Sequence, residues 1–171
     1  MDDDRGRRYG PRRNHADLRS RHRDGRPGVW AAQHPGILLT TFAEAAAGAE
    51  LVVNATSGRA SLAVKDTDSL GEQIQRAFPY AKVVKTLNTM NAHLMVEPQQ
   101  LADGDHSVFV SGDDTAAKQT VTDLLRSMGH TDVVDLGDIS TARGTEMMLP
   151  VWLRLYGALG TPAFNFKIVR G

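Results

Sequence analysis

The sequence predicts an α/β domain with a mainly parallel sheet, followed by a C-terminal helical segment. Short apolar runs alternate with stretches of helical periodicity from residue 37 onward. Helical connections of about ten or more residues favour right-handed crossovers between parallel strands. The final stretch, residues 141–160, is also helical in character and is apolar on almost every side between Met147 and Leu159. The α/β class follows from these three observations.

Composition is typical of one soluble domain and excludes several kinds of site. Of the 171 residues, 41% are apolar and 6% aromatic, and 20 basic residues balance 20 acidic ones. The absence of cysteine excludes a disulfide framework, a thiol nucleophile and a cysteine-ligated zinc site. Because the sequence has neither an apolar stretch of about 18 residues nor a signal-like start, we expect a cytoplasmic protein.

The segment 1–28 differs from the rest of the chain. Residues 1–26 contain nine arginines and five aspartates and carry a net charge of +4, whereas the remainder carries −4 and nearly all of the apolar residues. Such a segment buries too little surface to offset the entropy of ordering, so we predict a disordered, solvated tail. An arm that binds nucleic-acid phosphates is the alternative, which the interspersed aspartates and the lack of an aromatic platform disfavour.

Five short apolar runs, each followed by polar or turn-forming residues, are expected to be strands. The second run, for example, is followed by Thr56, Ser57 and Gly58. The predicted strands are residues 37–40, 51–55, 82–87, 107–111 and 133–136.

Capping patterns predict where the helices begin. Capping boxes occur at residues 41–44 and 69–72. Asp113 or Asp114 is expected to cap a third helix, which Gly129 ends. The expected apolar face of the second helix consists of Leu70, Ile74, Ala77 and Phe78.

The last helical segment should be kinked and covered. Pro150 predicts the kink, because proline cannot continue the helical hydrogen bonding. A helix that is apolar on all sides must be buried, either in its own domain or against a second subunit.

Three polar turns follow predicted strands, at the edge where parallel α/β sheets bind ligands. Residues 54–58 offer hydroxyl and backbone N–H groups that suit a nucleotide phosphate or ribose, although a plain polar loop is the favoured alternative. Residues 85–92 contain two asparagines and a methionine that could contact a planar heterocycle, unless Asn88 and Asn91 only cap the next helix. Residues 111–114 could offer a metal a pair of carboxylates, but adjacent aspartates before a helix are more often caps.

Several catalytic signatures are absent from the sequence. None of the six histidines has zinc-ligand spacing, and neither a G-x-S-x-G elbow nor a Walker loop occurs. The dinucleotide fingerprint G-x-G-x-x-G is missing as well. We therefore expect no metal site.

Four blocks of the chain are long and specific enough to indicate a protein family: DTDSLGEQIQ (66–75), VVKTLNTMNA (83–92), GDISTARGTEM (137–147) and FNFKIV (164–169). They resemble the NADP oxidoreductases that depend on the deazaflavin coenzyme F420, a family related to the catalytic N-terminal domain of pyrroline-5-carboxylate reductases. The resemblance implies a Rossmann-like domain that carries NADP(H), a small helical part that helps to form the deazaflavin cleft, and a homodimer. It also implies hydride transfer between NADP(H) and coenzyme F420.

The cofactor-binding residues follow from the same resemblance. Ala55, Thr56 and Ser57 would line the NADP site. Leu87, Asn88, Thr89 and Met90 would lie where nicotinamide and deazaflavin meet. Hydride transfer between two cofactors needs orientation and exclusion of water rather than a side-chain acid or base, so no catalytic residue is expected.

Two departures from the family predict an incomplete Rossmann-like parallel sheet. Residues 1–28 stand where the family has a strand and a glycine-rich turn, which suggests an out-of-frame segment or a mis-called start, and a further helix and strand are missing between Leu62 and Val64. The predicted organisation is a basic segment at 1–28, a partial NADP-binding domain at 29–140 and a helical segment at 141–171. Loss of the glycine-rich loop would impair activity, and the alternative is a non-catalytic nucleotide-binding or oligomerisation module.

Overall fold

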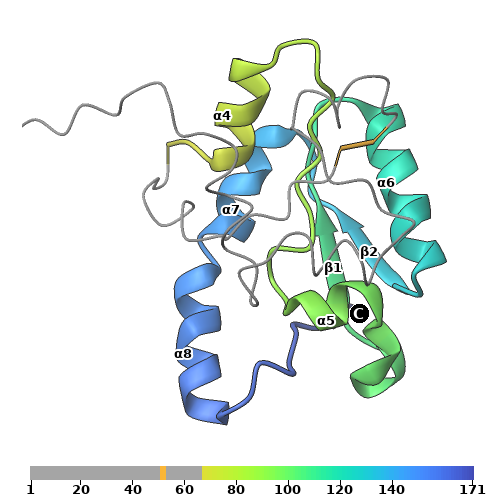
Figure 1. Ribbon diagram of the computed structural model, residues 1–171, viewed down its shortest axis with the longest axis vertical. Helices are drawn as coiled ribbons and strands as arrows, with labels where there is room; N and C mark the ends of the chain where they lie inside the picture. The colour runs from red at the N-terminus through yellow and green to blue at the C-terminus, as the bar shows by residue number, and fades with distance from the viewer. Residues whose placement is uncertain (1–50, 53–66) are drawn as a thin grey trace, which may run out of the picture. The chain divides into compact units, whose positions relative to one another are not determined.

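The computed structural model describes residues 51–52 and 67–171 (Figure 1). The chain divides into two compact units, and residues 67–171 all belong to the second, Thr56–Gly171. Leu51 and Val52 lie in neither a helix nor a strand, so the predicted strand does not include them. The remainder of that strand, the predicted segment 1–28, the strand 37–40 and the capping box 41–44 lie outside the described residues.

Two parallel strands form the sheet of this second unit. Strand β1 (Ser107–Val110) is entirely buried and pairs with β2 (Asp132–Asp135). Helix α6 (Thr115–Ser127) connects the strands and lies beside them (Figure 1). This crossover confirms the predicted parallel α/β arrangement, and both strands begin and end within one residue of the prediction.

The hydrophobic core lies between α6, β1 and the short helix α5 (Ala92–Val96). The Asp114 carboxylate caps α6 by accepting a hydrogen bond from the Ala117 N–H at 2.7 Å, as the sequence predicts. Gly129 follows that helix with a φ of +101°, a conformation that favours glycine. The fully or nearly buried core residues are Met90, Leu94, Val108, Val110 and Leu125.

Helix α4 (Leu70–Ala77) begins at the predicted capping box, where Ser69 Oγ accepts a hydrogen bond from the Glu72 N–H at 3.1 Å. The predicted apolar face is wrong, because Phe78 is 63% exposed. The buried residues of α4 are Gly71 and Glu72, which face the 3-10 helix η4 (Ile139–Thr141) and its continuation. Two further 3-10 helices, η2 (Pro98–Gln100) and η3 (Ala102–Gly104), lie between α5 and β1.

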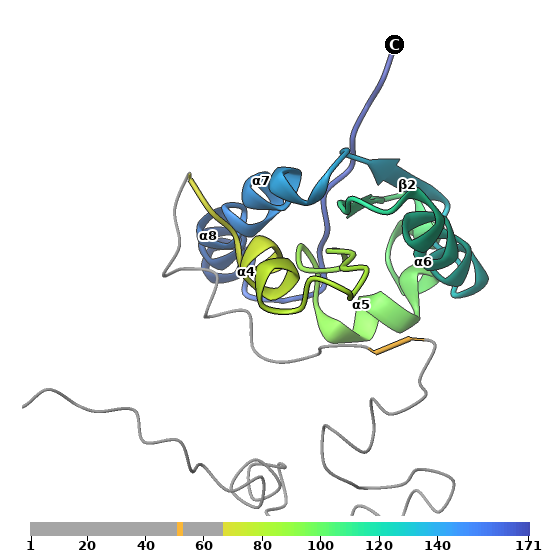
Figure 2. The same cartoon turned by 90° about the horizontal axis from the view of Figure 1, so that it is seen from above.

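The C-terminal helical segment is divided into two helices rather than kinked. Helix α7 (Ala142–Glu146) ends before α8 (Leu149–Leu159) begins, and Pro150 lies in the first turn of α8. Proline is tolerated there because the first N–H groups of a helix have no intrahelical acceptor. Figure 2 shows α4, α7 and α8 grouped on one side of the unit, with α6 and β2 on the other. No helix among the described residues is both long and apolar enough to cross a membrane.

The predicted strand 82–87 is also wrong, since it forms only one isolated bridge, between Lys85 and Ser111, and that bridge is antiparallel. The segment runs beside β1, but the Thr86 hydroxyl donates to the Phe109 carbonyl oxygen (2.7 Å) where a backbone N–H would continue a ladder. Leu87 then has a φ of +63°, which ends the extended backbone.

Candidate functional site

The polar segment 85–90 begins at the carboxyl end of β1. The Lys85 N–H donates to Ser111 O at 2.8 Å, and the Ser111 N–H donates to Lys85 O at 3.0 Å. Ser111 is the residue directly after β1. The bridge is antiparallel, so the segment runs from this end back along β1. Thr89 lies near Asn165, whose Nδ2 donates to Ser107 O at the amino end of the strand. Residues 87–90 therefore do not lie at the carboxyl edge of the β1–β2 sheet, where ligands of parallel sheets bind.

Leu87 has an unusual backbone conformation within this segment. Its φ of +63° is rare for a residue with a branched side chain. The side chain is half-buried and packs against the core. Backbone strain of this kind persists only where the surroundings hold it, and it concentrates at functional sites.

The two asparagines of the segment have different roles. The Asn91 side chain caps α5 by accepting a hydrogen bond from the His93 N–H at 3.2 Å, as the alternative interpretation predicted. Asn88 is not a cap. Its Nδ2 donates to the carbonyl oxygen of Thr145 in α7 at 2.8 Å, across 57 residues of sequence.

Thr89 and Met90 anchor the segment rather than line an open surface. Thr89 is 2% exposed, and its hydroxyl lies 3.5 Å from Asn165 Oδ1. Met90 is 5% exposed and belongs to the core. The expectation that the Met90 side chain packs against a bound ring therefore needs correction, because its surface is used by the core. Among the predicted site residues, Ala55, Thr56 and Ser57 lie outside the described part of the chain.

A buried carboxylate joins the segment to two helices. Glu146, at the end of α7, lies 3.0 Å from Lys85 Nζ through Oε1. Its oxygens also accept the N–H groups of Leu70 (2.8 Å) and Gly71 (3.1 Å) in the first turn of α4. The free N–H groups at this helix start are thus satisfied within the chain.

A second ion pair holds the same two helices. Arg143 donates to both oxygens of Glu72, through Nε at 2.8 Å and Nη2 at 2.5 Å. These hydrogen bonds hold the pKa of the Glu72 carboxyl below its ordinary value, against the opposing effect of burial. Sequence reasoning missed both ion pairs. All four charged residues lie inside the specific blocks 66–75, 83–92 and 137–147, which was the available signal.

The adjacent aspartates after β1 serve the fold. Asp114 caps α6, and the hydrogen bond from the Ala117 N–H, together with Lys82, lowers the pKa of its carboxyl. Asp113 Oδ1 accepts a hydrogen bond from the Ile139 N–H at 2.9 Å. No group of three or more metal-ligating side chains occurs among the described residues.

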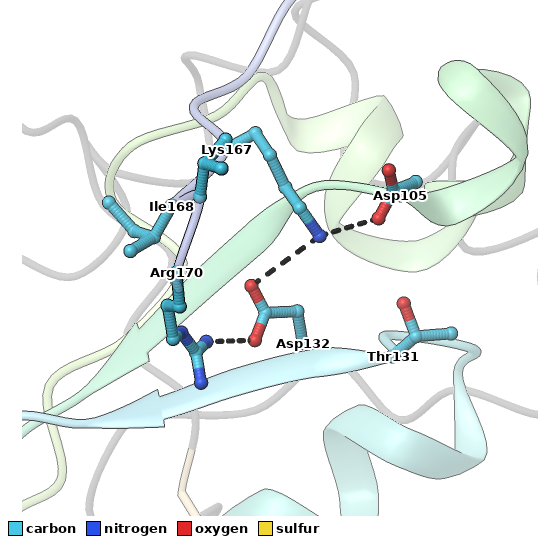
Figure 3. A pocket seen from close by; sticks show the side chains of 7 residues that line it. Asp105, Thr131, Asp132, Lys167, Ile168 and Arg170 are labelled. Carbon is cyan, nitrogen blue, oxygen red and sulfur yellow. Dashed lines mark hydrogen bonds and ion pairs between the residues drawn. The ribbon is translucent and has the colours of Figure 1, made fainter.

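A cavity of about 580 Å³ lies near the amino end of β2 (Figure 3). Its charged groups pair with one another: Lys167 Nζ lies 2.5 Å from Asp105 Oδ1 and 3.8 Å from Asp132 Oδ2. Arg170 forms a further ion pair with Asp132, the first residue of β2. With its charges paired internally, this cavity offers no comparable site.

Comparison with known proteins places the chain in a family. No known family profile matches it. A crystal structure assigned as an F420-dependent NADP reductase, from Arthrobacter sp. FB24, matches with a TM-score of 0.81 and 52% identity, covering 90% of this chain and 84% of that one. Metalloreductase STEAP3 of Rattus norvegicus is 31% identical over 119 residues, which is 67% of this chain and only 23% of that relative's length. The chain therefore belongs to the family of coenzyme F420-dependent NADP reductases.

Proposed function

We propose that the chain is an oxidoreductase that transfers a hydride between NADP(H) and coenzyme F420. One observation carries this proposal: the 52% identity, over 90% of the chain, to a structure assigned as an F420-dependent NADP reductase. The name of the rat relative also describes a reductase, which supports redox chemistry for the shared region.

Asn88 fits a cofactor ring. Its Nδ2 is committed to Thr145 O, and no described residue donates to its Oδ1. An amide oxygen of a half-buried asparagine can accept a hydrogen bond from the carboxamide of nicotinamide or from a ring N–H of a deazaflavin. We infer that Asn88 orients one of the two rings in this way.

The rest of the segment provides a fixed and partly apolar surface. Leu87 is half-buried and would offer the rest of its apolar side chain, while Thr89 and Met90 are buried and hold the loop in place. The two bound cofactors supply the hydride donor and acceptor. The residues of the chain orient the rings and exclude water, which is the contribution that this reaction requires of a protein.

Other parts of the assignment belong to the same proposal. Ala55, Thr56 and Ser57 would hold the phosphate or ribose of NADP(H) through hydroxyl and backbone N–H groups. Residues 29–140 would form the NADP-binding part and 141–171 the helical part, in a cytoplasmic homodimer.

The reaction can be tested directly with the purified chain. Oxidised coenzyme F420 is mixed with NADPH, and its absorbance and fluorescence are followed. We expect both signals to fall as the coenzyme is reduced. A folded chain that neither reduces nor binds coenzyme F420 would contradict the proposal.

A matched pair of variants tests the role of Asn88. Asn88→Ala should weaken the binding of the cofactor whose ring Asn88 contacts, coenzyme F420 or NADPH, about fivefold, because a hydrogen bond contributes about 1 kcal/mol. Asn91→Ala should leave binding unchanged but lower the stability by about 1 kcal/mol, since it removes a helix cap. Equal binding by the parent and Asn88→Ala would refute the assignment.

A non-catalytic nucleotide-binding or oligomerisation module is the second candidate. The missing G-x-G-x-x-G favours it, because that turn normally binds the pyrophosphate. Calorimetric titration with NADPH, combined with the reduction assay, distinguishes the candidates. A folded chain that binds NADPH without reducing coenzyme F420 supports a nucleotide-binding module, and one that binds no NADPH supports an oligomerisation module.

A further inference from the structure

We propose that Lys85 and Glu146 are positioning residues, whose ion pair sets the placement of Leu87 and Asn88 for hydride transfer. The inference rests on the proposed function, because it names the residues that align that same site. Neither residue is proposed to touch a cofactor.

Glu146 is the point where three segments meet. Its side chain is 3% exposed, and that of Lys85 is 19% exposed. The carboxylate accepts hydrogen bonds from two N–H groups of α4 and pairs with Lys85 Nζ at 3.0 Å. A buried charge is tolerated only when it is satisfied in this way, so each of these contacts constrains the others.

The segment 85–88 is attached to α7 at both of its ends. Lys85 pairs with Glu146, and Asn88 donates to the carbonyl oxygen of Thr145, the preceding residue of α7. Two consecutive residues of α7 therefore hold two points that are three residues apart. Leu87, with its φ of +63°, lies between these attachments, which explains how the strained conformation is maintained.

The backbone of the segment is fixed as well. Lys85 exchanges two hydrogen bonds with Ser111, and Thr86 donates to Phe109 O. The Lys85 side chain and main chain thus connect α7 to the end of β1. Loss of the ion pair would leave the main-chain contacts with β1 in place. It would loosen the attachment of the segment to α7, which Asn88 also contacts.

The structural alternative is that Glu146 serves only to cap α4, and variants of Lys85 distinguish this role from positioning. Glu146 caps α4 through Leu70 N and Gly71 N, whereas the Lys85 ammonium pairs with the carboxylate and takes no part in the cap. Lys85→Met removes the ammonium and keeps the cap, while Lys85→Arg restores the charge. Lys118→Met is the matched control, because Lys118 is 12% exposed and pairs with Asp135 at 2.9 Å, on the α6 side of the sheet.

The kinetic test compares these variants with the parent. NADPH deuterated at both C4 positions gives the isotope effect on hydride transfer. We expect Lys85→Met to lower kcat about tenfold or more, to change either KM less than about threefold, and to raise the isotope effect as the chemical step becomes limiting. Lys85→Arg should recover most of the rate, and Lys118→Met should match the parent.

Hydrogen exchange supplies a readout that does not depend on activity. In Lys85→Met we expect faster amide exchange at residues 86–90 and unchanged exchange in α6. Unchanged protection of residues 86–90 overturns the inference, as does an unchanged kcat and isotope effect in an active protein. A rise in the KM for NADPH without a fall in kcat also overturns it, since Lys85 would then bind the cofactor directly. If the parent reduces no coenzyme F420, the proposed function fails, and the exchange comparison still decides whether the ion pair holds the segment.

Discussion

Leu87 pays a conformational cost that a matched pair of substitutions can measure. A left-handed backbone is unfavourable by about 1 kcal/mol or more for any residue except glycine, and Leu87 has a φ of +63°. Leu87→Ala and Leu87→Gly both remove the side chain, but only glycine relieves the strain. We expect Leu87→Gly to be at least as stable as Leu87→Ala in urea denaturation. The usual advantage of alanine, if it were found here, would contradict this backbone conformation.

His130, a buried histidine that lies beside the buried His106, makes stability dependent on pH. Their ring centroids are 6.1 Å apart. His130 Nε2 lies 3.0 Å from Met95 O, while His130 Nδ1 is buried without a hydrogen-bond partner among the described residues. Burial lowers the pKa of His130, and neighbouring His106 lowers it further, against the opposing effect of the Met95 carbonyl.

The sign of the pH effect follows from the lowered pKa. Between the folded pKa and the ordinary value of 6.5, the unfolded chain binds the proton first. The free energy of unfolding should therefore fall as the pH drops below about 6.5. His130→Gln keeps an N–H donor but cannot titrate, so denaturation at pH 8 and pH 6 should give a smaller difference for this variant than for the parent. An identical difference would show that His130 does not contribute.

At the scale of elements, the contact between the segment 82–87 and the residues that follow β1 requires a glycine at position 112. A Cβ placed on Gly112 would lie 2.7 Å from the backbone oxygen of Val83, whereas one on Gly144, in α7, would meet nothing within 4 Å. We expect Gly112→Ala to lower the stability by about 1 to 3 kcal/mol. Gly144→Ala should raise it by up to about 1 kcal/mol through helix propensity. Thermal unfolding of the two variants would test the contact, and similar melting temperatures would argue against it.

Helix α8 is apolar but is not buried by the described residues. None of its residues is buried, and its exposed apolar side chains include Val151 (53%) and Leu159 (55%). We therefore keep the prediction that this helix lies in a subunit interface. Light scattering should give a dimer, and Val151→Glu should shift it toward monomer. A monomeric parent whose stability Val151→Glu does not change would refute the prediction.

At the scale of the whole molecule, features that depend on nearby sequence could be predicted and features that depend on distant partners could not. The caps at Ser69 and Asp114 each involve residues three apart, and β1 and β2 follow from short apolar runs. The apolar face of α4 was wrong because Ile139 and Ala142, far along the chain, pack against Gly71 instead of Phe78.

The candidate site shows the same division. The resemblance indicated Leu87 to Met90, and the structure shows this segment running antiparallel to β1 from the bridge between Lys85 and Ser111. The burial of Met90 depends on core residues more than a dozen positions away, such as Val108 and Leu125. Likewise, no local pattern reveals that Glu146 satisfies two N–H groups 75 and 76 residues earlier in the chain.

That separation has a consequence for the order of folding. Helix α4 is eight residues long, which is too short to be stable alone. Two of its first N–H groups donate to the Glu146 carboxylate, so these hydrogen bonds form only when α7 packs against α4. Closing such a long loop is slow relative to forming α6 and its adjoining strands. We therefore expect α4 to consolidate after the rate-limiting step. Glu146→Gln should then accelerate unfolding while leaving the refolding rate nearly unchanged in stopped-flow measurements. The same carboxylate would therefore determine the lifetime of the folded site.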